Sequence, residues 1–122
     1  MGKPVIMVVD DLQVVGGVVK SLLEDIYEIK VFTAGSEAIK YLADHPVDLI
    51  LLDYEMPEMT GYDVLMAIRA DKRYAKTPVV FLTAITNERL QAEMLEHGAS
   101  DYICKPIDVD VLRHRIKKHL GK

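Results

Sequence analysis

Several features that mark disulfide-rich, membrane-spanning or exported proteins are missing from this 122-residue chain. It has no tryptophan and one cysteine, Cys104, so an internal disulfide is excluded. No apolar run approaches the roughly 20 residues of a membrane span, and the first residues lack the apolar region of a secretory signal. We therefore expect a cytoplasmic protein with no membrane partner.

Moderate charge and an even composition exclude further classes. The formal net charge of −4 argues against general affinity for nucleic acid. The chain has no Walker A phosphate loop, no Ser/Gly-rich linker and no low-complexity tract. Its length fits one domain over residues 1–122, with one hydrophobic core. Cys104 follows Tyr102-Ile103 and is interpreted as a small buried apolar residue, not as a reactive thiol.

Five apolar runs alternate with segments of helical periodicity from one end of the chain to the other. Gly98 is typical of a helix end, and Asp108 is typical of the cap of the last helix. Gly16-Gly17 interrupts the first helical segment, which predicts close packing against a neighbour. The pattern is (βα)5 and predicts an α/β fold, a parallel sheet covered by helices on both faces. Strands are predicted at residues 4–9, 28–33, 47–52, 79–82 and 101–104.

Polar side chains gather where the predicted strands end. Ligands of open α/β sheets bind outside the carboxyl ends of the strands, where the strand order reverses. An aspartate that ends a buried strand, such as Asp53, is rarely placed there for packing. The residues at these ends are Asp10 and Asp11 after the first strand, Asp53 after the third, Thr83 after the fourth and Lys105 after the fifth.

This set of side chains predicts a site for a phosphoryl group. If the first and third strands are neighbours, three carboxylates come together, and their repulsion raises at least one carboxyl pKa unless a cation is bound. Mg²⁺ fits best, because it prefers oxygen ligands and works beside phosphate oxygens. The Thr83 hydroxyl and the Lys105 ammonium would meet the charge of a phosphoryl group. Asp53 would then be the nucleophile and become an aspartyl phosphate.

The motifs at these strand ends resemble those of the receiver domains of bacterial two-component response regulators. The resemblance covers essentially the whole chain and is closest to single-domain chemotaxis regulators. It implies a flavodoxin-like, doubly wound sheet of order 2-1-3-4-5. The motifs are Val8-Val9-Asp10-Asp11, the segment from Leu51 through Asp53 to Gly61, Val80-Phe81-Leu82-Thr83-Ala84, and the segment from Gly98 through Lys105 to Pro106.

The resemblance also implies roles for single residues. Asp53 would accept the phosphoryl group from a histidine kinase or a phosphotransfer protein. Asp10 and Asp11 would bind Mg²⁺ with Asp53, and the backbone carbonyl of Glu55 would complete the protein ligands. Lys105 would contact a phosphoryl oxygen, and its bond to the following proline is usually cis in the family.

A conformational switch is implied as well. In the family, the hydroxyl at the position of Thr83 moves toward the phosphoryl group, and an aromatic residue, here Tyr102, turns into the space that it leaves. The surface of the fourth helix, fifth strand and fifth helix would then change and bind a downstream protein target or an output domain. No direct nucleic-acid contact is expected.

Other polar residues have simpler interpretations. Glu55 borders the expected path of attacking water, and we hypothesise that its side chain alters the lifetime of the phosphoryl group; a solvated loop acid is the alternative. The four histidines share no metal-binding spacing and are expected at the surface: His45, His97, His114 and His119. The last helix is basic on its outer side, through a solvated or a docking face made by Arg113, Arg115, Lys117 and Lys118.

Two other functions compete with the signalling switch. An aspartate-nucleophile phosphohydrolase commonly has a second catalytic aspartate two residues after the nucleophile, where this chain has Glu55. A flavodoxin-like FMN module would need a phosphate loop rich in hydroxyls and glycine after the first strand, where this chain has Asp10-Asp11. We therefore expect a regulatory domain whose chemistry is limited to its own Asp53.

Overall fold

Five parallel strands and five helices alternate along the chain in the computed structural model, which describes residues 2–121. The strands lie in the order β2-β1-β3-β4-β5. Both the (βα)5 pattern and the 2-1-3-4-5 order are therefore confirmed. The strands are β1 Val5–Val9, β2 Glu28–Phe32, β3 Leu49–Asp53, β4 Val79–Thr83 and β5 Asp101–Cys104. The helices are α1 Gln13–Leu23, α2 Gly35–Asp44, α3 Gly61–Ala70, α4 Glu88–Glu96 and α5 Val109–Leu120, with a 3-10 turn, η1, at Lys72–Tyr74.

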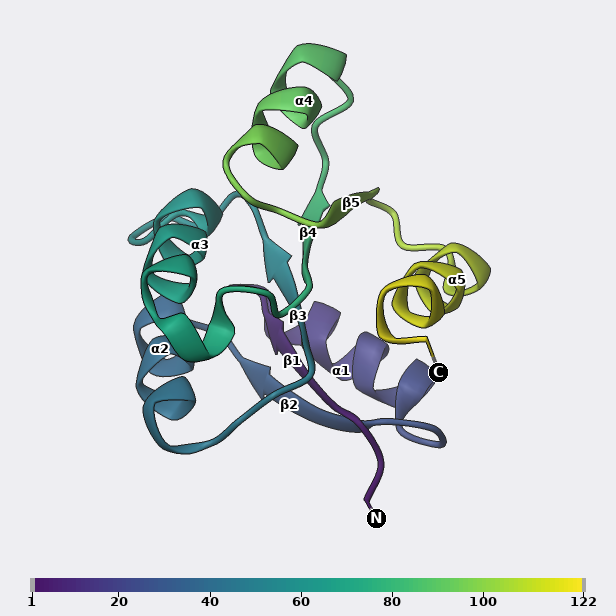
Figure 1. Cartoon of the computed structure of the whole chain (residues 1–122). Coiled ribbons are helices and arrows are strands. Elements are labelled where there is room, and N and C mark those ends of the chain that lie inside the picture. The colour runs from purple at the N-terminus through teal and green to yellow at the C-terminus, as the bar shows by residue number, and fades with distance from the viewer. Residues whose placement is uncertain (1, 122) are drawn as a thin grey trace.

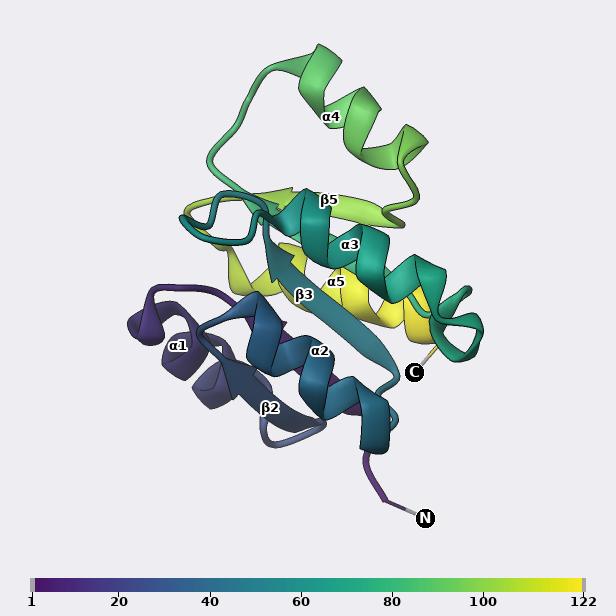
Figure 2. The same cartoon turned by 90° about the vertical axis from the view of Figure 1, so that its left-hand side faces the viewer.

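The helices cover the sheet on both faces, as the alternating pattern predicts. Figures 1 and 2 show α2 and α3 side by side on one face and α1 with α5 on the other. Every residue of β3 and β4 is buried, which explains their continuous apolar sequence. α4 stands beyond the β5 end of the sheet, apart from α3 in both views. The core therefore has two halves, one on each face of the sheet.

The glycine pair in α1 has two different environments. A Cβ on Gly16 would collide with the Val31 side chain of the neighbouring β2, whereas a Cβ on Gly17 would meet nothing within 4 Å. The predicted close packing is thus confirmed for Gly16 and wrong for Gly17, because only Gly16 faces the sheet.

The ends of some elements differ from the prediction. β3 begins at Leu49, and just before it the side chain of Asp48 accepts a hydrogen bond from the Val5 N–H (2.7 Å). β3 includes Asp53, because Asp53 still pairs with Leu82 of β4. The helical period of the sequence predicts that Leu12 and Ile26 belong to the first helix and face inward. Both lie outside α1 and are 55% and 46% exposed. Within residues 2–121, no helix has the length and apolar character that crossing a membrane requires.

The interpretation of Cys104 as a buried residue is wrong. Cys104 is exposed, whereas its neighbour Ile103 is buried. Alternate residues of a strand face opposite sides of the sheet, and β5 is an edge strand whose Cys104 side is covered only in part by α4. The apolar run Tyr-Ile-Cys suggested burial on both faces, which an edge strand does not provide.

Candidate functional site

Three carboxylates meet at the carboxyl ends of β1 and β3. These strands are neighbours, with Val9 opposite Leu52, so the next residues Asp10 and Asp53 come side by side. Their carboxylate oxygens and one from Asp11 all lie within 4.8 Å of one another. Asp10 and Asp53 are 1% and 3% exposed, whereas Asp11 is open to solvent. The predicted acidic cluster is therefore present, with two of its members buried in the sheet edge.

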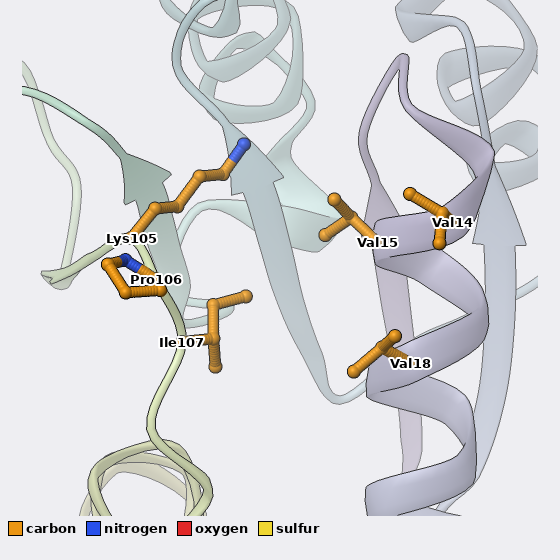
Figure 3. Close-up of a pocket in the computed structure, with 6 residues that line it drawn as sticks. All are labelled: Val14, Val15, Val18, Lys105, Pro106 and Ile107. Atoms are coloured by element: carbon orange, nitrogen blue, oxygen red, sulfur yellow. The ribbon is translucent and has the colours of Figure 1, made fainter.

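Lys105 reaches this cluster from the loop after β5. Its Nζ donates to Asp10 Oδ2 at 3.0 Å and to Asp53 Oδ1 at 3.2 Å. Figure 3 shows the Lys105 side chain extending away from Pro106, with its nitrogen at the tip of a strand. The Lys105–Pro106 bond is cis, as the family resemblance implies. Burial alone would lower the pKa of Lys105, but the two carboxylates raise it above its ordinary value.

The charge of the cluster remains unbalanced despite Lys105. Burial, the charge of Asp10 and a contact with Asp11 raise the pKa of Asp53 to about 7, and Lys105 offsets this rise only in part. This rise in the pKa of Asp53 agrees with the repulsion between carboxylates that the sequence predicts. A second cation near the carboxylates would favour the ionised form of Asp53.

The donor set fits a hard divalent cation. It consists of carboxylate oxygens only, and Mg²⁺ combines such oxygens with several waters. The exposed Asp11 leaves the cluster open to solvent on one side. Glu55 lies exposed in the loop after β3, where its N–H donates to Asp53 Oδ1 at 3.3 Å. The acidic cluster could thus hold Mg²⁺ beside Asp53.

Thr83 and Tyr102 lie on the two strands beyond Asp53. Thr83 is fully buried, and its hydroxyl accepts a hydrogen bond from the Ile85 N–H at 2.9 Å. Within the described residues, no hydrogen bond joins Thr83 to Asp53. Tyr102 is half-buried and packs against the core on the α2–α3 face. The two residues are diagonal neighbours on adjacent strands, because Thr83 pairs with Cys104 and Phe81 with Tyr102.

Comparison with known proteins decides the family. The family model of the response regulator receiver domain matches residues 6–117. The chain belongs to this family. The chemotaxis protein CheY of Pseudomonas aeruginosa is 34% identical over 115 residues, which cover 93% of each chain. A probable cyclic di-GMP phosphodiesterase of Vibrio cholerae is 37% identical, but the chain spans only 26% of its length. The likeness to that protein concerns about a quarter of it.

Solved structures show the same fold as this receiver domain. The chemotaxis protein CheY4 of Vibrio cholerae superimposes with a TM-score of 0.92, at 28% identity, over 98% of this chain and 100% of that one. The receiver domain of the sensor histidine kinase PA1611 of Pseudomonas aeruginosa gives a TM-score of 0.87 at 26% identity, over 99% and 100%. That structure was solved with a magnesium ion in its active-site cleft. The flavodoxin-like receiver fold is thereby confirmed.

The basic residues of α5 serve the receiver domain partly as structural contacts. Arg115 and His119 each lie 2.9 Å from a carboxylate oxygen of Asp101 on β5. Arg113 donates to the Leu22 carbonyl at 2.6 Å, so its head group also contacts the protein. The predicted solvated face holds for Lys117 and Lys118, which are exposed. Arg113 is only partly solvated, because its side chain is 42% exposed and its head group also bonds to Leu22. The solvated face is wrong for Arg115, and the surface placement is wrong for His119, whose side chain is 18% exposed.

Two polar residues on helices escaped the sequence analysis. Arg69 of α3 donates to the carbonyls of Gly98, Tyr74 and Thr77 over 2.7–3.1 Å. Gln91 of α4 is buried, three residues before the buried Met94. For Gln91 a signal was present, because a polar residue at this spacing lies on the apolar side of the helix. For Arg69 there was none, since its partners are backbone carbonyls.

An apolar groove adjoins the site on the α1 side. Val14, Val15 and Val18 line it from α1, and Lys105, Pro106 and Ile107 from the loop before α5. Figure 3 shows Val15 and Val18 pointing across the groove toward Ile107. Val14 and Val18 are 69% and 49% exposed. The same lysine that meets the carboxylates therefore also borders an exposed apolar surface.

Proposed function

We propose that this receiver domain is a phosphorylation-dependent signalling switch whose phosphoacceptor is Asp53. The observation that supports it best is the ammonium of Lys105, 3.0 and 3.2 Å from two buried carboxylates at the tips of neighbouring strands. A buried carboxylate paired with a lysine and left partly unbalanced suits a site that receives a further anionic group. Membership of a regulatory family supports a switch and not an enzyme that turns over other substrates.

The chemistry would take place at one carboxylate oxygen of Asp53. This oxygen forms a bond to phosphorus while the bond from phosphorus to the donor atom, a histidine nitrogen, breaks. Lys105 lies where it can meet the charge of the incoming oxygens. Asp10, Asp11, Asp53 and the backbone carbonyl of Glu55 would hold Mg²⁺, which supplies further compensation of phosphoryl charge. Lys105 favours the ionised, nucleophilic form of Asp53, and a bound ion would add to this effect.

The phosphodonor would be a histidine kinase or a phosphotransfer protein. The groove between α1 and the loop after β5 suits its docking, because exposed apolar side chains lie directly beside the site. A donor helix seated there would bring its phosphohistidine to the strand tips. The relation to the receiver domain of a sensor histidine kinase supports a partner of this class.

The output would pass through Thr83 and Tyr102. An aspartyl phosphate has a charge approaching −2 and three acceptor oxygens, which offers the Thr83 hydroxyl a new partner. Its movement and that of Tyr102 would remodel the surface of α4, β5 and α5. A downstream protein or an output domain would bind that surface, without direct contact to nucleic acid or membrane. We further propose that residues 1–122 act as a single phosphoacceptor domain.

The Glu55 side chain would influence how long the phosphoryl group persists. It is exposed two residues after Asp53, next to the path of attacking water. A carboxylate there either repels phosphoryl oxygens or binds the metal through water, and either contact would change the rate of dephosphorylation. Equal dephosphorylation rates in wild type and Glu55→Gln would remove this idea.

Labelling with acetyl phosphate tests the central proposal. Wild type should acquire an acid-stable, alkali-labile phosphoryl group when Mg²⁺ is present, and Asp53→Asn should acquire none. Chelation with EDTA should abolish labelling of wild type. Asp110→Asn, which removes an exposed carboxylate at the start of α5, is the control and should label like wild type. Undiminished labelling of Asp53→Asn would refute the nucleophile.

A further inference from the structure

Gln91 is a buried polar residue that the proposed chemistry does not use. Among residues 2–121 four polar or charged residues are buried, and the other three are Asp10, Asp53 and Thr83. Gln91 is 7% exposed and lies on α4, away from the carboxylates. A buried amide needs hydrogen-bond partners, since leaving it without them costs free energy. Its partners therefore show what it does.

The side chain of Gln91 holds the loop that joins β4 to α4. Its Nε2 donates to the Ile85 carbonyl at 3.0 Å and lies 3.5 Å from Cys104 Sγ. The Cys104 thiol itself lies 3.8 Å from the same carbonyl. The N–H of Ile85 in turn donates to the Thr83 hydroxyl at 2.9 Å. Both backbone groups of Ile85 are thus engaged, one by Gln91 and the other by Thr83.

This arrangement matters because α4 has few other attachments. Gln91 and Met94 are its buried residues, and the helix stands apart from α3 in both views. Met94 contributes apolar contact, which is not directional. The amide of Gln91 instead fixes the position of one carbonyl, and through Ile85 it restrains the Thr83 hydroxyl.

We propose that Gln91 is a positioning residue that latches the loop of residues 84–87 in the unphosphorylated conformation. The inference rests on the proposed function of Asp53. While Gln91 holds Ile85, the Thr83 hydroxyl stays bonded to the Ile85 N–H. For Thr83 to turn toward a phosphoryl group, that bond must break or Ile85 must move, and either change strains the bond to Gln91. The latch therefore biases the switch against its phosphorylated form.

Gln91→Met tests the latch, because methionine keeps the unbranched shape and lacks the N–H donor. Loss of one net hydrogen bond should raise the hydrogen-exchange rate of the Ile85 amide about fivefold in the absence of phosphodonor. The initial rate of labelling by acetyl phosphate should rise by about the same factor. Leu95→Met, an exposed position on the same helix, is the matched control and should change neither rate.

A double-mutant comparison separates a latch from a merely structural role. In a Thr83→Ala background there is no hydroxyl for the latch to restrain, so Gln91→Met should leave the labelling rate unchanged. The same increase in both backgrounds, or an unchanged Ile85 exchange rate, would overturn the latch while leaving Asp53 as phosphoacceptor. Failure of wild type to label would instead refute the proposed function.

Discussion

The helices α3 and α4 follow the two strands that end at Asp53 and Thr83, and they are held very differently. α3 begins with a capping box in which Thr60 and Asp63 exchange hydrogen bonds, and it buries Gly61, Val64, Leu65 and Ile68. α4 has only an asparagine cap, and its buried residues are Gln91 and Met94. The strand that carries the nucleophile thus continues into a firmly packed helix. The strand that carries the responding hydroxyl leads to a weakly attached one.

This difference suits a switch. The nucleophile Asp53 must keep its position relative to Lys105. The β4–α4 segment, in contrast, must change conformation at a small cost in free energy. Few buried contacts and dependence on single hydrogen bonds are physical marks of a segment that opens easily. The predictions below test whether the β3–α3 side is rigid and the β4–α4 side movable.

The largest effect is expected at Gly61, where α3 meets β3. A Cβ there would lie 2.5 Å from the Asp53 carbonyl oxygen and 2.7 Å from the Tyr54 Cα, which are backbone atoms. We expect Gly61→Ala to lower the free energy of unfolding in urea by about 3 kcal/mol, since the backbone must shift. Gly17→Ala is the control: its site is open, and alanine should raise stability by about 1 kcal/mol. If Gly61→Ala lowered the free energy of unfolding by less than Thr83→Ala does, the β3–α3 side would not be rigid.

The charge of Asp53 should give the next largest effect, through pH. Its pKa is about 7 in the folded protein without metal and about 3.9 when unfolded. The folded state therefore binds the proton more tightly, and the free energy of unfolding falls by at most about 3 kcal/mol as pH rises from 4 to 7. Urea unfolding in EDTA should show this slope, and Mg²⁺ should reduce it. Asp53→Asn should lack the slope; the same slope in that variant would exclude Asp53 as its cause.

A smaller cost in stability is expected for Thr83→Ala on the β4–α4 side. The substitution removes one hydroxyl that accepts from Ile85, so about 1 kcal/mol of unfolding free energy should be lost. Asp53 should still label with acetyl phosphate. In wild type, phosphorylation should increase the hydrogen-exchange rates of the α4 amides, measured by NMR. In Thr83→Ala these rates should not change on phosphorylation. A full response in the variant would show that α4 does not depend on Thr83.

The smallest effect is expected at Cys104. The residue is exposed, and its sulfur makes only the long contacts to Gln91 and Ile85. Cys104→Ala should change the free energy of unfolding by less than about 0.5 kcal/mol. Alkylation by N-ethylmaleimide should proceed in the folded protein under native conditions. Protection of the thiol until unfolding would restore the interpretation of Cys104 as a core residue.

The sequence predicted the features that depend on hydrophobic periodicity and on the residues at the ends of strands. Buried parallel strands appear as apolar runs, and parallel strands put their carboxyl ends at one edge, so the sequence alone groups Asp10, Asp53 and Lys105. Strand order came only through the family resemblance. Cys104 could not be placed, since an apolar residue on an edge strand has the same sequence signal as one in the centre. Arg69 was missed because it bonds to backbone carbonyls, whose positions depend on the completed fold. The helical spacing of Gln91 and Met94 indicated burial of Gln91, but not its partner, the Ile85 carbonyl.

The contacts of Arg69 have a mechanical consequence for α4. Its Nε and Nη2 donate to the Gly98 carbonyl at 3.1 and 2.9 Å, just past the carboxyl end of that helix. Its Nη1 donates to the carbonyls of Tyr74 and Thr77, which precede β4, so the same guanidinium joins Gly98 to that segment. One end of α4 is therefore anchored, while the other depends on the bond from Gln91 to Ile85. When that bond opens, we expect α4 to rotate about its fixed end at Gly98. The end of α4 nearest Asp53 should then move furthest.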